Sequence, residues 1–141
     1  MKTNLIVVGN EKDPVLEEAI CAGLNTFNDQ ITGSNDRIPL TVIVRDPDTN
    51  EALGGIIGRS SLGLAFLDLF HLPDVLRGSG LGTEVLRMFE EEALRRGCRS
   101  AVLYTISFQA PGFYEKNGWI RFGEVACEPE GASRVFMSKK L

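Results

Sequence analysis

The feature that most constrains the fold is a predicted strand, a glycine-rich loop and an amphipathic helix that follow one another over residues 64–96. Leu64–Leu72 is an apolar run with one acidic side chain, Asp68, and predicts a long strand. Apolar residues recur with helical spacing over Gly82–Arg96, where Glu90–Glu92 is expected to face solvent and Gly97 to follow the helix. A strand that turns through glycines into a helix indicates a sheet with helices packed on it.

Short apolar runs predict the other strands, and several are separated by turn residues typical of hairpins. Further strands are expected over residues 5–8, 40–45, 52–58, 100–107, 119–125 and 134–139, and further helices over residues 13–27 and 111–117. Asp13 is the expected N-cap of the first helix, and residues 28–39 are expected to form a loop. This order of elements indicates an α+β (mixed α/β) fold.

Length and charge limit the number of domains and the kinds of partner. The 141 residues, at 15.5 kDa, predict one domain, residues 1–141, because a second core needs roughly a hundred residues more. The 15 basic and 19 acidic residues give a net charge of -4, which argues against binding to a nucleic-acid backbone. No uncharged run approaches the roughly 18–20 apolar residues of a membrane span, and no signal peptide is expected.

The three cysteines, Cys21, Cys98 and Cys127, form no CxxC pair and no cluster with the single histidine, His71. We therefore expect no metal site and no disulfide framework. Unpaired thiols are typical of the reducing cytoplasm, so the expected location is cytoplasmic.

The glycine-rich loop, Arg77–Gly82, is a candidate anion site. Its alternating glycines let backbone N–H groups converge at a helix N-terminus, where the helix dipole also favours phosphate, and Arg77 adds a cation. The loop is not a P-loop, because Gly82 is followed by Thr83 and not by lysine. Its glycine spacing also departs from the dinucleotide-binding fingerprint. A tight turn alone remains the structural alternative, although one glycine suffices for a turn.

Two segments resemble motifs of the GCN5-related N-acetyltransferase (GNAT) superfamily. Arg77, Gly80 and Gly82 fill the Arg-x-x-Gly-x-Gly pattern of its pyrophosphate loop. Ser107–Trp119 is similar to its later Asn-x-x-Ala-x-x-Phe-Tyr-Glu-Lys-x-Gly-Phe block. The resemblance implies a mostly antiparallel sheet of six to seven strands, splayed between its fourth and fifth strands and flanked by three to four helices. Acyl-CoA would then lie in the opening between those two strands.

The same resemblance implies which residues bind acetyl-CoA. Backbone groups near Leu72 would contact the pantetheine arm and polarise the thioester carbonyl, and Tyr114 would face the sulfur. Ser107 stands where the family often has asparagine, and His71 where an aromatic or aliphatic residue is commoner. The binding residues implied in this way are Leu72, Arg77, Gly78, Ser79, Gly80, Leu81, Gly82, Thr83, Ser107 and Phe113.

Acyl transfer from a thioester to an amine needs a base for the amine and an acid for the leaving thiolate. Asp68 is the expected base, because strand alternation places it on the face of Leu72, and a carboxylate within an apolar run is costly without a purpose or partner. A carboxylate that merely faces solvent is the alternative. His71 is expected on the opposite face, packed or solvent-facing. Tyr114 is the expected acid. A phenol pKa near 10 and a thiol pKa near 8.5 make full proton transfer to the thiolate uphill by only about 2 kcal/mol, which allows partial donation in the transition state. The alternative is that Tyr114 only packs the short helix onto the sheet.

The sequence thus predicts an N-acyltransferase that moves acetyl from acetyl-CoA to a primary amine of a small molecule or peptide by direct attack in a ternary complex. A non-catalytic acyl-CoA-binding or regulatory module on the same fold is the alternative. The acceptor stays undetermined, because residues 25–39, the expected acceptor side, show no diagnostic chemistry. Homodimers are common in the family, and the sequence leaves this point open.

Overall fold

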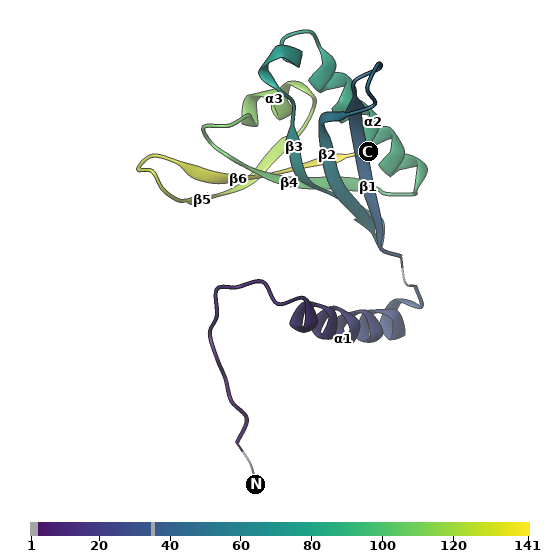
Figure 1. The fold of residues 1–141 in the computed structure, drawn as a ribbon, viewed down its shortest axis with the longest axis vertical. Coiled ribbons are helices and arrows are strands. Elements are labelled where there is room, and N and C mark those ends of the chain that lie inside the picture. The colour runs from purple at the N-terminus through teal and green to yellow at the C-terminus, as the bar shows by residue number, and fades with distance from the viewer. Residues whose placement is uncertain (1–2, 35) are drawn as a thin grey trace. The chain divides into compact units, whose positions relative to one another are not determined.

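The computed structural model describes residues 3–34 and 36–141, and the chain divides into two units at this break (Figure 1). The first unit contains helix α1 (Pro14–Thr32). The second contains the sheet, helices α2 (Leu81–Arg95) and α3 (Pro111–Lys116), and the short 3-10 helix η1 (Asp74–Leu76). The candidate site lies within the second unit.

Helix α1 begins where the sequence predicts. The Asp13 carboxylate accepts a hydrogen bond from the Leu16 N–H at 3.0 Å, which caps the helix. The helix is longer than expected, because residues 28–32 continue it and Gly33, with φ 67°, ends it in the left-handed conformation. No residue of α1 is buried.

The strand predicted over residues 5–8 is wrong. These residues have no regular structure, and their four apolar side chains are at least 84% exposed. An apolar run forms a strand only where another strand pairs with it, and no strand among the described residues pairs with this one. Composition alone therefore overstated the strand count.

Six strands form one sheet, and all neighbouring pairs but one are antiparallel. The strands are β1 (Ile38–Arg45), β2 (Ala52–Ser61), β3 (Leu64–His71), β4 (Ser100–Ile106), β5 (Ile120–Ala126) and β6 (Ser133–Lys140). Their order across the sheet is β1-β2-β3-β4-β6-β5. The predicted fold class and the mostly antiparallel sheet are confirmed.

The exception is the pair β3 and β4, which is parallel and short. Leu64–Phe66 pairs with Ser100–Val102, and the later residues of the two strands do not pair with each other. Figure 1 shows β3 continuing beside β2 while β4 turns away together with β6. This confirms the predicted splay, because β3 and β4 are the fourth and fifth of the strands expected from the sequence.

Helix α2 covers one face of the sheet through four buried side chains, Val85, Leu86, Phe89 and Ala93. Burying a side chain such as Phe89, which is 0% exposed, contributes about 1.5–3 kcal/mol. The strand residues of the same core are Leu40, Ile56, Ala65, Leu67, Ala101, Leu103, Val135 and Met137. The apolar spacing of this helix predicts these four positions, whereas Met88, which belongs to the same apolar stripe, is 49% exposed.

Glu90 departs from the expected solvated face of α2. Its side chain is only 13% exposed and pairs with the Lys139 ammonium of β6. The same carboxylate accepts a hydrogen bond from the indole Nε1 of Trp119 at 3.2 Å. These partners offset the cost of burying the charge, and they tie α2 to the last strand.

A β-bulge interrupts β3 at Asp68. Ile57 of β2 pairs with Leu69 and Gly58 pairs with Leu67, so Asp68 has no partner in the register. An extra residue of this kind shifts the alternation of side chains between the two faces of a strand. The positions after the bulge therefore exchange faces relative to the simple pattern.

This shift corrects two expectations about strand faces. Leu72 is buried, whereas Asp68 is exposed, so the two do not share a face as predicted. His71 is also exposed, and with Leu69 it follows Asp68 onto the open face of the sheet. The bulge thus brings Asp68 and His71 to the same face, where simple alternation would separate them.

Candidate functional site

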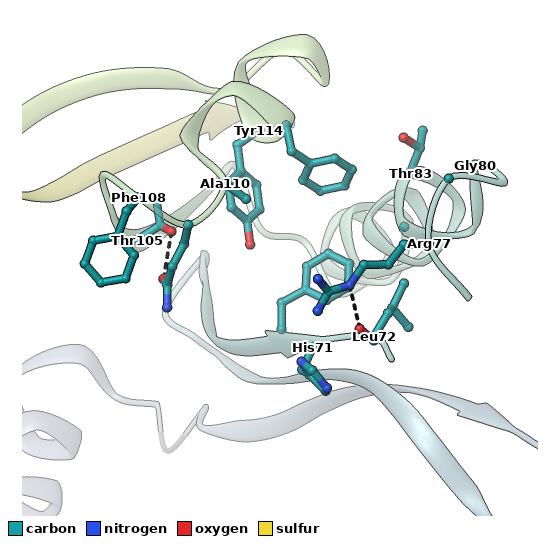
Figure 2. A pocket seen from close by; sticks show the side chains of 14 residues that line it. His71, Leu72, Arg77, Gly80, Thr83, Thr105, Phe108, Ala110 and Tyr114 are labelled. Atoms are coloured by element: carbon teal, nitrogen blue, oxygen red, sulfur yellow. Dashed lines mark hydrogen bonds between the residues drawn. The ribbon is translucent and has the colours of Figure 1, made fainter. Parts of the chain in front are cut away.

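A cavity of about 760 Å³ opens in the second unit where β3 and β4 separate. Its walls come from the end of β3, the glycine-rich loop with the start of α2, and the segment that leads from β4 into α3 (Figure 2). The two segments that resemble family motifs therefore line one cavity, although they are far apart in the sequence. Of the implied binding residues, those that line it are Leu72, Arg77, Gly78, Gly80, Gly82, Thr83 and Phe113.

The glycine-rich loop forms the part of the wall best suited to an anion. Gly78 and Gly80 have φ values of 81° and 85°, in the left-handed region that favours glycine, which lets the chain turn sharply into α2. Gly80 is the N-cap of α2, and no side chain caps this helix. The N–H groups of its first turn therefore have no side-chain acceptor and are available to an anion.

Arg77 joins this loop to the end of β3. Its Nε donates a hydrogen bond to the Leu72 carbonyl at 2.8 Å (Figure 2), and its Nη1 lies 3.0 Å from the Asp74 carboxylate. These two contacts hold the guanidinium beside the cavity with donors left over for a ligand. The Leu72 carbonyl, one of the backbone groups implied for the pantetheine contact, therefore already accepts a hydrogen bond from Arg77.

Tyr114 projects its hydroxyl into the cavity (Figure 2). The ring is 7% exposed and packs edgewise against Phe113, Trp119 and Phe70, with centroids 5.3, 5.9 and 6.5 Å away. Burial raises the pKa of this phenol from 10.0 to about 12. No hydrogen bond joins the hydroxyl to another described residue, and every fully buried side-chain polar atom among them has a partner. The hydroxyl is therefore protonated at neutral pH and free to donate to a ligand.

Three implied binding residues do not line the cavity: Ser79, Leu81 and Ser107. Ser107 is held in a link to β6, because its Oγ accepts a hydrogen bond from the Ser133 N–H at 3.0 Å and its N–H donates to the Ser133 carbonyl at 2.8 Å. Leu81 packs on the core and not toward the cavity.

The sequence reasoning missed other lining residues, namely Phe70, Thr105, Phe108, Gln109 and Ala110. Thr105 is 6% exposed, and its hydroxyl donates to Gln109 Oε1 at 3.1 Å. Gln109 Oε1 also accepts the Ile106 N–H, and Gln109 lines the cavity. A polar residue inside the apolar strand β4 was the available signal for Thr105.

Asp68, the expected base, does not line the cavity. Its carboxylate is paired with Arg59, whose Nη1 lies 2.9 Å from both carboxylate oxygens, and the two side chains are 41% and 52% exposed. The Arg59 guanidinium also lies 4.2 Å from the centroid of the Phe66 ring. The structure thus gives Asp68 a partner on the open face and does not bring it to Tyr114.

His71 lies at the end of β3 and lines the cavity. Figure 2 shows its ring on the other side of β3 from the Tyr114 hydroxyl. Among the described residues no carboxylate lines the cavity, so its titratable groups within that part of the chain are His71, Arg77 and Tyr114.

The arrangement of a splayed sheet, a glycine loop and an aromatic-lined cavity matches a known family. The model of the Acetyltransferase (GNAT) family matches residues 16–119. This chain belongs to that family. It is 31% identical over 135 residues to acetyltransferase Atu2258 of Agrobacterium fabrum, across 96% of this chain and 98% of that one. It is 30% identical over 95 residues to blasticidin-S acetyltransferase of Streptomyces morookaense, across 67% and 70% of the two chains.

Solved structures of the same family share the fold. A protein from Agrobacterium tumefaciens, provisionally named an acetyltransferase, is 30% identical and superimposes with a TM-score of 0.90 over 98% of this chain and 100% of that one. An acetyltransferase from Bacillus cereus is 26% identical and superimposes with a TM-score of 0.78 over 96% of this chain and 98% of that one. A more distant Bacillus anthracis protein, provisionally named a streptothricin acetyltransferase and solved with acetyl coenzyme A, shares the fold at 17% identity and a TM-score of 0.62, over 74% of this chain and 63% of that one.

The described residues contain neither a metal-binding cluster nor a membrane-spanning helix. No group of three or more histidine, cysteine, aspartate or glutamate side chains among residues 3–34 and 36–141 is placed to hold a metal ion. Within the same ranges, no helix is both long enough and apolar enough to cross a membrane.

Proposed function

We propose that this GNAT-family acetyltransferase transfers the acetyl group of acetyl-CoA to a primary amine, the two substrates being bound together. The observation that supports this most strongly is the single cavity that combines an uncapped helix N-terminus with a protonated, unpartnered phenol. The first feature suits the pyrophosphate and the second suits the leaving thiolate. The acetyl coenzyme A in the Bacillus anthracis structure supports the same choice of donor.

In this proposal, different parts of the cavity bind different parts of acetyl-CoA. The Arg77–Thr83 segment binds the pyrophosphate, with the first-turn N–H groups of α2 and the Arg77 guanidinium as donors. The thioester lies between the ends of β3 and β4, near Tyr114. The nitrogen of the neutral amine attacks the carbonyl carbon, the C–N bond forms and the C–S bond breaks. One amine proton leaves to solvent or to the thiolate, and Tyr114 donates a hydrogen bond to the departing sulfur.

The amine also needs a base to accept its proton. Asp68 stays a prediction from the sequence, because its carboxylate lies outside the cavity lining and is paired with Arg59. The lack of a carboxylate in the lining is also what favours the second candidate, an acyl-CoA-binding module without turnover.

Two measurements test the proposal in order. Saturating acetyl-CoA, at about 100 times its Kd, stabilises the protein by about 2.7 kcal/mol and raises the thermal midpoint by several degrees, whereas ATP and NAD at equal concentration do not. Release of the CoA thiol then depends on added amine, with blasticidin S among the acceptors because of the relative that bears its name. Binding without amine-dependent release would favour the module, and no binding would refute both.

A further inference from the structure

A second hollow adjoins the cavity and shares one residue with it. This hollow, which we name the β1–β3 groove, has a volume of about 510 Å³ and is lined by residues of the first three strands. His71 lines both the groove and the cavity. The two hollows therefore meet at the end of β3, where the Tyr114 hydroxyl lies on one side of the strand and the His71 ring on the other (Figure 2).

The groove is apolar and is built around glycines of β2. Its exposed apolar walls include Ile43, Ile57 and Leu69, which are 50%, 57% and 65% exposed. Over residues 3–34 and 36–141, the lining includes one ionisable side chain, His71, and no carboxylate. Gly55 has φ 137°, and a Cβ there would lie 1.9 Å from a carbonyl oxygen of β1, so a side chain cannot occupy this position without displacing the strand.

We propose that the β1–β3 groove binds the acceptor, a primary amine carried on an apolar aliphatic or aromatic body, and that His71 takes the proton from its ammonium group. This inference rests on the proposed function. Continuity with the acetyl-CoA cavity through His71 argues for a reacting molecule as the occupant. The apolar lining argues against a polycation, which would need carboxylates.

The proposed step balances without a further reactant. The His71 imidazole accepts one proton from the ammonium group of the bound acceptor, which leaves a neutral amine. The amine nitrogen attacks the thioester carbon, the C–S bond breaks, and the second amine proton leaves to solvent or to the thiolate. A primary amine has a pKa of about 10.4, so at neutral pH this first deprotonation limits the fraction ready to react.

Few charged groups surround the ring. Across the cavity the titratable side chains are Arg77 and Tyr114, and along β3 the nearest is Asp68, already paired with Arg59. Gly55, the register partner of His71 on β2, carries no charge. A pH dependence that disappears with the imidazole would therefore report on His71 itself.

The first test replaces the imidazole by an amide, His71→Gln, with hexylamine and phenethylamine as acceptors and spermidine as the polycation. We expect kcat/KM for the apolar amines to fall at least about 100-fold at pH 7, as for loss of a general base, while the Kd of acetyl-CoA stays within twofold. The loss should shrink as the pH approaches 10, where the free amine no longer needs a base. A parallel Asp68→Asn variant tests the alternative base.

The second test fills the groove with Ile57→Trp. We expect the KM for hexylamine to rise at least tenfold with the Kd of acetyl-CoA unchanged. Ile120→Trp is the matched control, because Ile120 is 69% exposed on β5 and lines neither hollow. Circular dichroism and the urea midpoint of each variant establish that it folds.

Failure of the two proposals is distinguishable. If wild-type protein binds acetyl-CoA and acetylates amines but His71→Gln keeps its activity, or if spermidine is the better acceptor, the groove proposal is overturned and the proposed function stands. A loss in Asp68→Asn with none in His71→Gln returns the base to Asp68. If Ile57→Trp changes the oligomeric state in solution and leaves the KM alone, the groove is a contact between copies and not an acceptor site.

Discussion

Replacing Tyr114 by phenylalanine removes one hydroxyl from the cavity and leaves the aromatic packing in place. The ring contacts with Phe70, Phe113 and Trp119 do not involve the hydroxyl, and that hydroxyl has no hydrogen-bond partner among the described residues. We therefore expect the free energy of unfolding at pH 7 to change by less than about 0.5 kcal/mol. Any loss of activity in this variant then reports on chemistry and not on folding.

The pKa of Tyr114 sets the size of the expected effect. With that pKa at about 12 and a thiol near 8.5, full proton transfer to the thiolate is uphill by about 5 kcal/mol, more than the ordinary tyrosine value implies. The hydroxyl therefore acts as a hydrogen-bond donor to developing negative charge. Such a bond contributes about 1.5–3 kcal/mol, so kcat should fall roughly 10- to 150-fold.

The assay is CoA thiol release at saturating amine, beside isothermal titration with acetyl-CoA. We expect kcat of Tyr114→Phe to fall while the Kd of acetyl-CoA stays within threefold. The same variant should also lose part of the decline in folding stability that wild type shows at alkaline pH. Because burial raises the folded pKa from 10.0 to about 12, wild-type stability declines by roughly 3 kcal/mol as pH rises through that interval, and this decline should be absent without the phenol. An unchanged kcat would refute the reasoning about Tyr114.

Two further predictions concern the glycine loop and the end of α2. Arg77→Ala should raise the Kd of acetyl-CoA roughly 10- to 100-fold, as expected for loss of a charged hydrogen bond. The control is Arg87→Ala, which removes an exposed arginine outside the cavity and should leave that Kd unchanged. Equal affinities of the two variants for acetyl-CoA would exclude the loop as the pyrophosphate site. Hydrogen bonds from Arg95 and Arg96 lower the pKa of Glu92 from 4.5 to about 2, so this carboxylate contributes stability above pH 4.5 that is lost as pH falls toward 2. Glu92→Gln should unfold at a lower temperature than wild type at pH 7, and the gap should close by about pH 2 in a melting series; a gap that persists would contradict the pairing.

The elements that place the site could be predicted because they depend on local patterns. The apolar spacing of α2, the glycines before it and the short helix around Tyr114 are each encoded within a few residues of sequence. The splay of β3 from β4 came from the family resemblance and not from the strands themselves. Local pattern and family motif together were enough to bring Arg77 and Tyr114 to one cavity.

The β-bulge at Asp68 could not be predicted, because it depends on how two strands pair. The apolar run 64–72 contains no sign of an interruption, yet β2 pairs with Leu67 and Leu69 and omits the residue between them. Every face assignment after that point reverses. This one register shift changed the interpretation of Asp68, His71 and Leu72 together.

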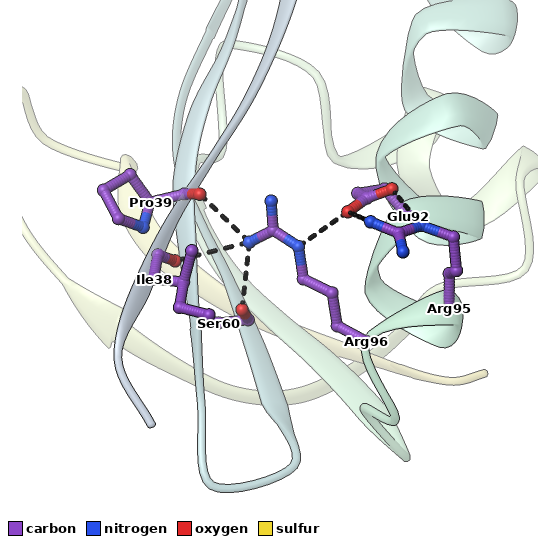
Figure 3. A network of polar contacts seen from close by, with 6 residues as sticks. All are labelled: Ile38, Pro39, Ser60, Glu92, Arg95 and Arg96. Carbon is purple, nitrogen blue, oxygen red and sulfur yellow. Dashed lines mark hydrogen bonds and ion pairs between the residues drawn. The ribbon is translucent and has the colours of Figure 1, made fainter. Parts of the chain in front are cut away.

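The contacts of Arg96 show the same limit. The sequence places Arg96 at the end of α2, where it complements the helix dipole. In the structure its Nε donates to Glu92 at 2.7 Å, and its Nη1 donates to the Pro39 carbonyl at 3.0 Å and the Ser60 hydroxyl at 3.1 Å (Figure 3). Pro39 and Ser60 belong to β1 and β2, far from Arg96 in the sequence, so only the assembled fold brings these two partners to it.

The most direct test of the account is to follow a labelled acetyl group. Wild-type protein is incubated with acetyl-CoA tritiated in the acetyl group and an excess of hexylamine, and the products are separated after denaturation. The account predicts that the label appears in the amide, with one acetyl transferred for each CoA thiol released and none on the protein. Label that stays in acetyl-CoA although the protein binds it would make this chain a binding module, and label bound covalently to the protein would contradict direct attack by the amine.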